Sequence, residues 1–334
     1  MAKKTILFAS VILIFAGAAY SADNVFVGGS FSDPGVSARA MGMGGAFTAA
    51  VNDGNATWWN PAAMGMLTKE KSLSLTYVPS MYSLTTGSIS RFFGSYVQGD
   101  SEGFGALGGS LSYMSINLGS EYIGDTEYSW TEYIVTVSWG MQIDRLIGWA
   151  KYEYPKLSAG ANIKYAGVST DVLVDESAVG AGGFSFDAAL LLALKNNFVI
   201  GLMGRDVFSH IKWDSGTGER IPFTVSAGIF YGITDNFAVA ADIKAAETND
   251  SGNTGAAVQS IAAGAEYGIE FGRTAQVKKI DFRGGVDYEL STDSSAVTGG
   301  ISLYMDTFSV DYAYRHLVKS MLDGTHRFGL TLDF

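Results

Sequence analysis

The chain has no cysteine among its 334 residues, so it can hold neither a disulfide nor a cysteine-linked lipid anchor. Charged residues are few, at 16 %, and the acidic ones outnumber the basic ones to give a formal net charge of −11. A net acidic chain argues against nucleic acid as a partner. Long hydrophobic runs are also missing, because no run after residue 21 approaches the roughly 20 apolar residues of a transmembrane helix.

The first residues have the pattern of an export signal. Lys3 and Lys4 precede an apolar run at 6–15, and small residues follow around Ala18, Ala19 and Ser21. This order is typical of a secretory signal peptide, and the apolar run is too short to span a membrane as a helix. We therefore expect residues 1–21 to be a signal peptide that is removed on export.

The apolar content, 47 %, is high for a chain with 42 glycines and no helical membrane span. In lipid only helices and closed barrels satisfy every backbone polar group, so such a chain points to a barrel. From residue 72 onward apolar and polar residues alternate in segments of about ten, as in membrane strands. Fourteen strands are predicted, at residues 72–82, 88–97, 103–118, 127–143, 157–167, 183–195, 198–206, 221–233, 236–246, 258–271, 279–290, 296–306, 308–316 and 324–334.

Alternation alone would also fit a soluble sandwich, which buries its apolar face. The export signal, the long segments and aromatic residues near segment ends, such as Trp130, Trp139, Tyr267 and Tyr288, favour lipid on the outside. The predicted fold is therefore all-β, a 14-stranded antiparallel transmembrane β-barrel over residues 72–334.

The segment before these strands, residues 35–67, differs from everything that follows it. Gly42, Gly44 and Gly45 let backbone pass close to backbone, and several alanines keep the segment thin. Asn60-Pro61 is typical of a turn, since Asn tolerates turn geometry and Pro removes a backbone donor. We expect a small, compact plug here.

This segment resembles the N-terminal hatch of FadL-type outer-membrane transport proteins, and it is most similar to the PorV/PorQ branch. The resemblance is carried by ARAMG at 38–42, GAF at 45–47, the turn at 52–53 and NPA at 60–62, with further matches at 219–222, 235–237, 240–242, 311–314 and 324–328. In that family the hatch lies inside a barrel of fourteen strands, which implies a hatch over residues 22–71 of this chain. The implied hatch residues are Arg39, Gly42, Gly44, Gly45, Phe47, Asp53, Asn60, Pro61 and Ala62.

Charges of both signs fall on the predicted polar face of the strands, at Lys164, Asp187, Asp242, Lys244, Glu266, Asp281, Arg283, Asp311, Arg315 and Arg327. Unpaired charges in a narrow lumen are costly, so we expect ion pairs across strands and between the wall and the hatch. Arg39 is the natural hatch partner. The alternative is a wet lumen without specific pairing.

The predicted connections alternate in character. After even-numbered strands come tight turns at 196–197, 234–235 and 305–307, with longer links at 144–156 and 272–278. After odd-numbered strands come loops rich in Asp, Ser, Gly and Thr, at 168–182, 207–220 and 247–257. With both chain ends in the periplasm, the tight turns fall inside and the longer loops outside, as membrane barrels require.

Glycine is frequent in the third predicted strand, at Gly103, Gly105, Gly108 and Gly109. Interior glycine weakens a strand and often marks a bulge or a close backbone contact. In FadL relatives the corresponding strand kinks inward and leaves a gap in the wall, so the resemblance implies a lateral opening at these residues. The other hypothesis is close packing of the hatch against small wall residues.

The chain ends on alternating apolar residues, Phe328, Leu330, Leu332 and Phe334. This ending resembles the signal that the barrel assembly machinery of the outer membrane reads. A soluble edge strand is the alternative, and the terminal aromatic residue argues against it.

We expect no catalytic residue, no cofactor and no metal. Residues 42–45 lack the strand–turn–helix context of a nucleotide site, and the turn at 52–55 lacks the later acidic ligands of a calcium loop. The histidines His210, His316 and His326 lie in or beside predicted loops, without a nucleophile fixed beside a base or paired metal ligands.

Two non-enzymatic functions follow from the resemblance. The PorV/PorQ branch implies a component of protein export or surface presentation, with secretion-system proteins as partners. The alternative is passive, FadL-like transport of small hydrophobic molecules, such as fatty acids, through the plugged barrel. In both cases the barrel lies in outer-membrane lipid.

Overall fold

The computed structural model describes residues 36–68, 70–79, 88–100, 103–118, 128–144, 153–174, 177–250, 253–272, 274–318 and 324–334. The predicted signal peptide, residues 1–21, lies outside these ranges.

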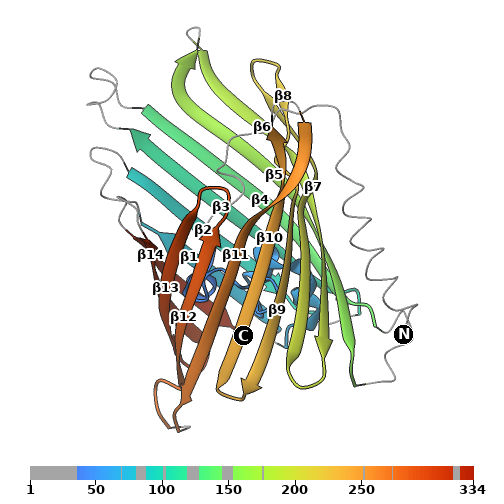
Figure 1. Cartoon of the computed structure of the whole chain (residues 1–334), viewed down its shortest axis with the longest axis vertical. Helices are drawn as coiled ribbons and strands as arrows, with labels where there is room; N and C mark the ends of the chain where they lie inside the picture. Colours follow the sequence, from blue (N-terminus) through green and yellow to red (C-terminus); the bar gives the residue numbers. More distant parts are fainter. Residues whose placement is uncertain are drawn as a thin grey trace.

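One antiparallel sheet closes on itself to form the wall of the molecule (Figure 1). Its strands are β1 (Lys71–Val78), β2 (Ser88–Gln98), β3 (Ala106–Leu118), β4 (Tyr128–Gln142), β5 (Lys156–Val174), β6 (Ser177–Leu194), β7 (Phe198–Trp213), β9 (Thr224–Thr234), β10 (Phe237–Asp250), β11 (Asn253–Glu270), β12 (Lys279–Glu289), β13 (Ser294–Tyr304), β14 (Phe308–Val318) and β15 (Thr325–Asp333). Each pairs with its neighbours along the chain, and β1 pairs with β15. The two-residue strand β8 (Gly218–Glu219) adds to the end of β7. The predicted 14-stranded antiparallel barrel is confirmed.

The outer face of the wall is apolar. Neighbouring residues on a strand differ sharply in exposure: Phe92 is 40 % exposed and Phe93 2 %, while Val135 is 46 % exposed and Ile134 5 %. Since successive side chains of a strand point to opposite faces, the exposed members form an apolar band that hydrocarbon covers in a membrane barrel. Among the described residues, no helix is both long and apolar enough to cross a membrane.

The segment from Val36 to Leu67, which we call the inner segment, lies inside the barrel (Figure 1). It contains the short helices α2 (Ala38–Gly42) and α3 (Ala56–Trp59) and the 3-10 helix η2 (Pro61–Met66). α2 packs against β12 to β15 and η2 against β3 to β6, so the segment reaches from one side of the lumen to the other. Its small and aromatic side chains make up much of the buried core.

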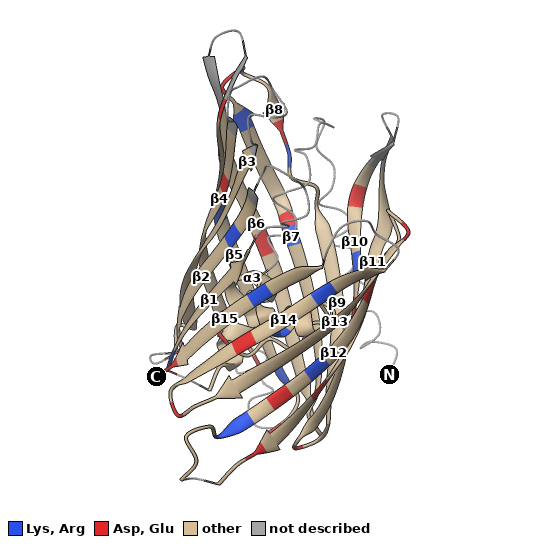
Figure 2. Ribbon diagram, turned by 90° about the vertical axis from the view of Figure 1, so that its left-hand side faces the viewer, with Lys and Arg blue, Asp and Glu red and all other residues tan. Residues whose placement is uncertain are grey.

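Three predicted loops are strands instead. β5 and β6 fill most of 168–182, β7 continues to Trp213, and β10 and β11 fill most of 247–257. The prediction was wrong because Asp, Ser, Gly and Thr suggest loops, whereas here most of these residues pair with a residue of the neighbouring strand. The longer strands raise part of the rim, and Figure 2 shows β5 to β7 and β10 to β11 standing above β12 to β15.

The predicted tight turns lie together at the other end of the barrel. Asn196 and Asn197 form one of them, with positive φ values of 64° and 56° that Asn tolerates. We call this the turn end, and the end with the extended hairpins the loop end (Figure 1).

Candidate functional site

The NPA triplet, residues 60–62, forms a turn, and it is one of two places where the inner segment rests directly on the barrel wall. We call each such place a seat. Asn60 Oδ1 accepts a hydrogen bond from the backbone N–H of Ala62 at 3.1 Å, and Pro61 opens η2. Inward-facing Gly140 on β4 and Gly160 on β5 lie directly beneath, since a Cβ at either position would overlap the backbone of Pro61 or Ala62. The wall thus lacks side chains where η2 touches it.

A second seat lies across the lumen, where the inner segment turns back on itself. Gly44 has a φ of 69°, which a side chain would strain. A Cβ at Gly264 would overlap the carbonyl of Met43, and one at Gly285 would overlap the backbone nitrogen of Gly44. Backbone therefore packs directly on backbone at this seat.

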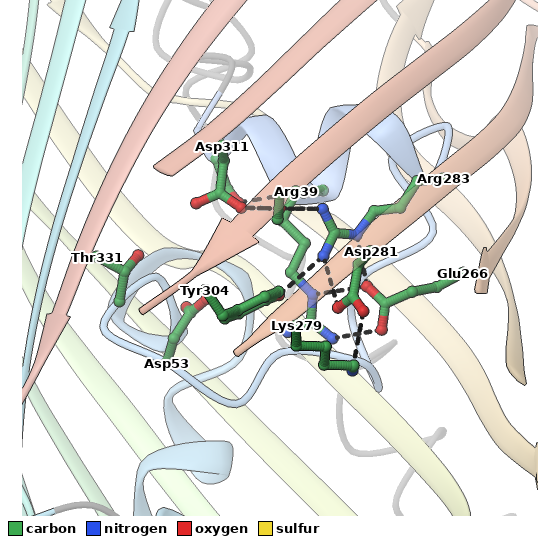
Figure 3. A network of polar contacts seen from close by, with 12 residues as sticks. Arg39, Asp53, Glu266, Lys279, Asp281, Arg283, Tyr304, Asp311 and Thr331 are labelled. Carbon is green, nitrogen blue, oxygen red and sulfur yellow. Dashed lines mark hydrogen bonds and ion pairs between the residues drawn. The ribbon is translucent and has the colours of Figure 1, made fainter. Parts of the chain in front are cut away.

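An ion network ties α2 to the wall (Figure 3). Arg39 donates from Nε to Glu266 Oε2 at 3.1 Å and from Nη2 to Oε1 at 3.3 Å, and it also donates to Asn52. Glu266 accepts a second ion pair from Arg283, which also donates to Asp281 at 3.3 Å. The ion pair expected between Arg39 and the wall is present, and Glu266 is the carboxylate shared by two arginines.

Burial and neighbouring charges shift the pKa values of two groups of the inner segment, Arg39 and Asp53. Burial opposes the charge of Arg39, but the attraction and hydrogen bonding of Glu266, together with the attraction of Tyr304 and Asp53, outweigh it and raise the pKa of the Arg39 guanidinium. Burial also raises the pKa of the Asp53 carboxyl, while the positive charge of Arg39 acts in the opposite direction. Arg39 therefore keeps its charge and its ion pair at all ordinary pH values.

Asp242 on β10 holds the middle of the inner segment. Its Oδ2 accepts hydrogen bonds from the backbone N–H groups of Phe47 at 3.0 Å and Thr48 at 2.8 Å. On the other side of this turn, Asn60 Nδ2 donates to the carbonyl of Thr48 at 2.9 Å. The turn is thus fixed by one wall carboxylate and by the NPA asparagine.

A buried ion cluster lies beside α3. Lys164 Nζ is 2.6 Å from Asp187 Oδ1 and 2.7 Å from Asp206 Oδ1. Asn162 Nδ2 donates both to Asp187 at 2.8 Å and to the carbonyl of Thr57 at 2.9 Å, which joins the cluster to the inner segment. Asp206 reaches the lumen because the register of β6 and β7 shifts around it, at a φ of 55°. The sequence shows the charges but not this bulge.

Apolar side chains face the lumen between the inner segment and the loop end. Phe93, Ile134, Val168, Ile211 and Ile221 are each at most 5 % exposed and pack together in one cluster, which we call the mouth cluster. The indoles of Trp58, Trp130 and Trp213 border it. The alternation of apolar and polar residues predicts a polar lumen, so this cluster was not predicted. The available signal was the break in alternation where two apolar residues adjoin, as in Phe92-Phe93 and Ile134-Val135.

Two cavities flank the inner segment. The turn-end cavity, about 620 Å³, is lined by Arg39, Asp53, Glu266 and Asp281 among others. The loop-end cavity, about 150 Å³, is lined on one side by Trp58 and Trp59 and on the other by charged wall residues that include Asp242. The inner segment separates the two.

The glycines of the third predicted strand leave no gap in the described wall. Gly103 and Gly105 precede β3, while Gly108 and Gly109 pair with both β2 and β4 in unbroken ladders. A Cβ at Gly108 would lie 3.0 Å from Met64 Cε and 3.1 Å from Thr57 Cγ2 of the inner segment. The geometry at this point fits close packing against the inner segment and does not fit a lateral opening.

The remaining predicted site residues lie on the last strands. Phe328, Leu330, Leu332 and Phe334 belong to β15 or end it, and β15 pairs with both β14 and β1 where the barrel closes. Their recognition by the assembly machinery stays a prediction.

The histidines lie on strands and not in loops. His210 is on β7, His316 on β14 and His326 on β15, where Nδ1 of His326 is 2.8 Å from the hydroxyl of Tyr312. In the described part of the chain, no group of three or more His, Cys, Asp or Glu side chains is placed to hold a metal ion.

Comparison with known proteins gives a fold but no family. Neither the family models nor the curated proteins contain a match. Among solved structures, the P. putida toluene transporter TodX has a TM-score of 0.63 at 14 % identity over 90 % of this chain and 99 % of that one. The Ralstonia pickettii toluene transporter TbuX has 0.61 at 16 % over 91 % and 100 %. A Pseudomonas aeruginosa FadL homologue has 0.54 at 14 % over 87 % and 96 %. The chain therefore has the fold of FadL-type outer-membrane barrels.

Proposed function

We propose that this protein is a passive outer-membrane transporter of small hydrophobic molecules, with the inner segment as its hatch. The mouth cluster carries the proposal, because it places apolar side chains inside the lumen on the side from which an external molecule arrives. The fold shared with the toluene transporters TodX and TbuX supports it. The assignment to the outer membrane rests on the same likeness and on the apolar outer face.

Transport would begin with the partition of an apolar molecule from water into the mouth cluster. A small apolar molecule gains about 25 cal/mol for each Å² of its surface that leaves water, so it collects at the mouth cluster. Passage to the turn end then requires the inner segment to move, because Phe47, Ala56 and Ala62 are fully buried across the lumen. The concentration gradient drives the process, and no cofactor is involved.

Uptake of radiolabelled toluene and oleate by cells that express the full chain in place of their own hydrocarbon channels tests this function. We expect Phe93→Gln and Ile134→Gln to slow uptake several-fold, since each puts an amide into the mouth cluster. The control is Ser309→Asn, a polar exchange at a lumen-facing position beside the turn-end cavity, which should leave uptake unchanged. Uptake no faster than in cells without the protein would refute the proposal.

The PorV/PorQ resemblance supports a second candidate, a partner role in protein export. It predicts that deletion of the gene changes the set of secreted proteins and leaves hydrocarbon uptake intact. Transport predicts the reverse, so comparing both readouts in one deletion strain separates the two functions.

A further inference from the structure

We propose that the barrel also contains a gated, hydrated path for small polar solutes, above all cations, which runs along β9 to β12 and is held shut by Asp242. This path differs from the hydrophobic route in its position and in the chemistry of its lining. The mouth cluster lies mainly on the β2 to β7 side of the lumen, whereas β9 to β12 each contribute lining residues to both cavities. Trp58 borders the mouth cluster and the loop-end cavity alike.

The two cavities are separated by one layer of small residues. On three neighbouring strands, a single lumen-facing residue lies between a lining residue of the turn-end cavity and one of the loop-end cavity. These separating residues are Gly228 on β9, Ala240 on β10 and Gly264 on β11. Lining residues four positions apart on a strand are about 13 Å apart, so the barrier is thin.

The inner segment and the side chain of Asp242 fill this layer, because the separating residues carry at most a methyl group. A Cβ at Gly264 would overlap Met43, and a Cβ at Gly228 would overlap Asp242 Oδ1 and lie 3.0 Å from Thr48 Cβ. Displacing the turn from Met43 to Thr48 by a few ångströms, together with the Asp242 side chain that holds it, would join the cavities. The backbone of the wall would not need to change.

Asp242 is the wall group that holds this turn in place. Its carboxylate accepts hydrogen bonds from the N–H groups of Phe47 and Thr48, at 3.0 and 2.8 Å, and it also lines the loop-end cavity. Two hydrogen bonds to one charged oxygen are strong contacts, so the turn stays closed while they last. Their loss leaves the turn held by the bond from Asn60 to the carbonyl of Thr48 and by backbone bonds within the inner segment, such as that from the N–H of Gly45 to the carbonyl of Ala40.

The lining indicates the solute class. The turn-end cavity has six carboxylates, those of Asp53, Asp235, Glu266, Asp281, Asp311 and Asp333, against the two basic side chains of Arg39 and Lys279. The loop-end cavity has the opposite balance, with four basic side chains, those of Arg205, Lys244, Arg315 and Arg327, against the three carboxylates of Asp242, Asp287 and Glu289. The two cavities together therefore have nine carboxylates and six basic side chains, and a net excess of carboxylates along a narrow passage favours cations over anions. Apolar solutes would gain nothing here, so this path complements the hydrophobic route.

Single-channel recording of the full chain in planar lipid bilayers, with KCl on both sides, tests the gate. We expect the unsubstituted chain to be mostly closed and Asp242→Ala to raise the open fraction at least tenfold, with a reversal potential in a KCl gradient that shows preference for potassium. The control is Ile243→Ala, one residue along β10 on the outer face of the wall, where the side chain is 44 % exposed, and it should leave the open fraction unchanged. A folded Asp242→Ala protein without increased conductance, or one that prefers chloride, would overturn the proposal.

A crosslink provides a second test, which uses the absence of cysteine in the chain. In Thr48→Cys with Gly228→Cys the two Cβ atoms would start 3.0 Å apart, so a small outward shift of the turn brings them to the separation of about 3.8 Å that a disulfide takes. When the two cysteines are added to the Asp242→Ala variant, oxidation to the disulfide should close the channel, and a reducing agent should restore its conductance. Asp242→Val, whose side chain offers no acceptor to the N–H groups of Phe47 and Thr48, replaces the alanine if that variant fails to fold. Conductance that persists with the crosslink formed would place the path elsewhere. Toluene uptake is a separate readout, so failure here leaves the hydrophobic route standing.

Discussion

At the scale of single residues, Glu266 is the charge on which the ion network depends. It is 12 % exposed and binds both Arg39 and Arg283, so Glu266→Ala removes the carboxylate that the two arginines share. We expect this variant to lower the free energy of unfolding by about 3 kcal/mol. Arg39→Ala should cost less, because Arg283 still neutralises Glu266. Urea unfolding in lipid vesicles, followed by tryptophan fluorescence, measures both, and equal losses would contradict the shared-carboxylate account.

Of this network, the role of Arg39 could be predicted from the sequence, but its pairing with Glu266 could not. Arg39 is the single arginine of the inner segment and so was recognisable as its ion-pair partner, but Glu266 lies 227 residues away and its position depends on strand register. The cluster of Lys164, Asp187 and Asp206 was beyond prediction for the same reason, because a bulge in β7 brings Asp206 inward. Which charged residues meet in the lumen thus depends on the pairing of distant strands, and local sequence patterns do not reveal that pairing.

At the scale of elements, the seat of the inner segment depends on wall glycines that face inward. Gly285→Val would drive a side chain into the backbone of Gly44, so we expect the turn to leave its seat and trypsin to reach Arg39. The matched control is Gly284→Val, one residue along on the outer face, where an added Cβ meets nothing within 4 Å. Limited proteolysis with mass spectrometry locates the cut. Equal cleavage in both variants would show that the seat does not hold the segment.

Strands were predicted correctly where alternating side chains determine the strand, and they were missed where pairing with a neighbouring strand determines it. β12 was predicted at 279–290 and lies at Lys279–Glu289, because apolar Ile280, Phe282 and Val286 alternate strictly with polar residues. The ends of β5 and β6 were missed because their small polar residues carry no pattern of their own, and cross-strand partners hold them in the sheet. The mouth cluster was missed because pairs of adjoining apolar residues do not reveal which member faces inward.

At the scale of the whole molecule, the unequal strands predict a topology. Tight turns belong to the periplasmic end of a membrane barrel and long hairpins to the outside. A peptide tag inserted after Asp250, at the β10 to β11 hairpin, should bind its antibody on intact cells. A tag inserted between Asn196 and Asn197 should bind only after the outer membrane is permeabilised. Binding at both sites on intact cells would reverse or abolish the assigned orientation.

The whole account depends on one property of the strands: their apolar face meets hydrocarbon and their opposite face meets the lumen. Because the chain has no cysteine, a nitroxide spin label can be attached through single cysteines placed in turn along 134–139 of β4 in lipid vesicles. Oxygen, which concentrates in hydrocarbon, should collide often with labels at Val135, Val137 and Trp139, which are 46 %, 62 % and 37 % exposed, and rarely with those at Ile134, Thr136 and Ser138. A two-residue period in oxygen accessibility is the predicted result. Uniform accessibility along β4, or a period with the two faces exchanged, would contradict the account.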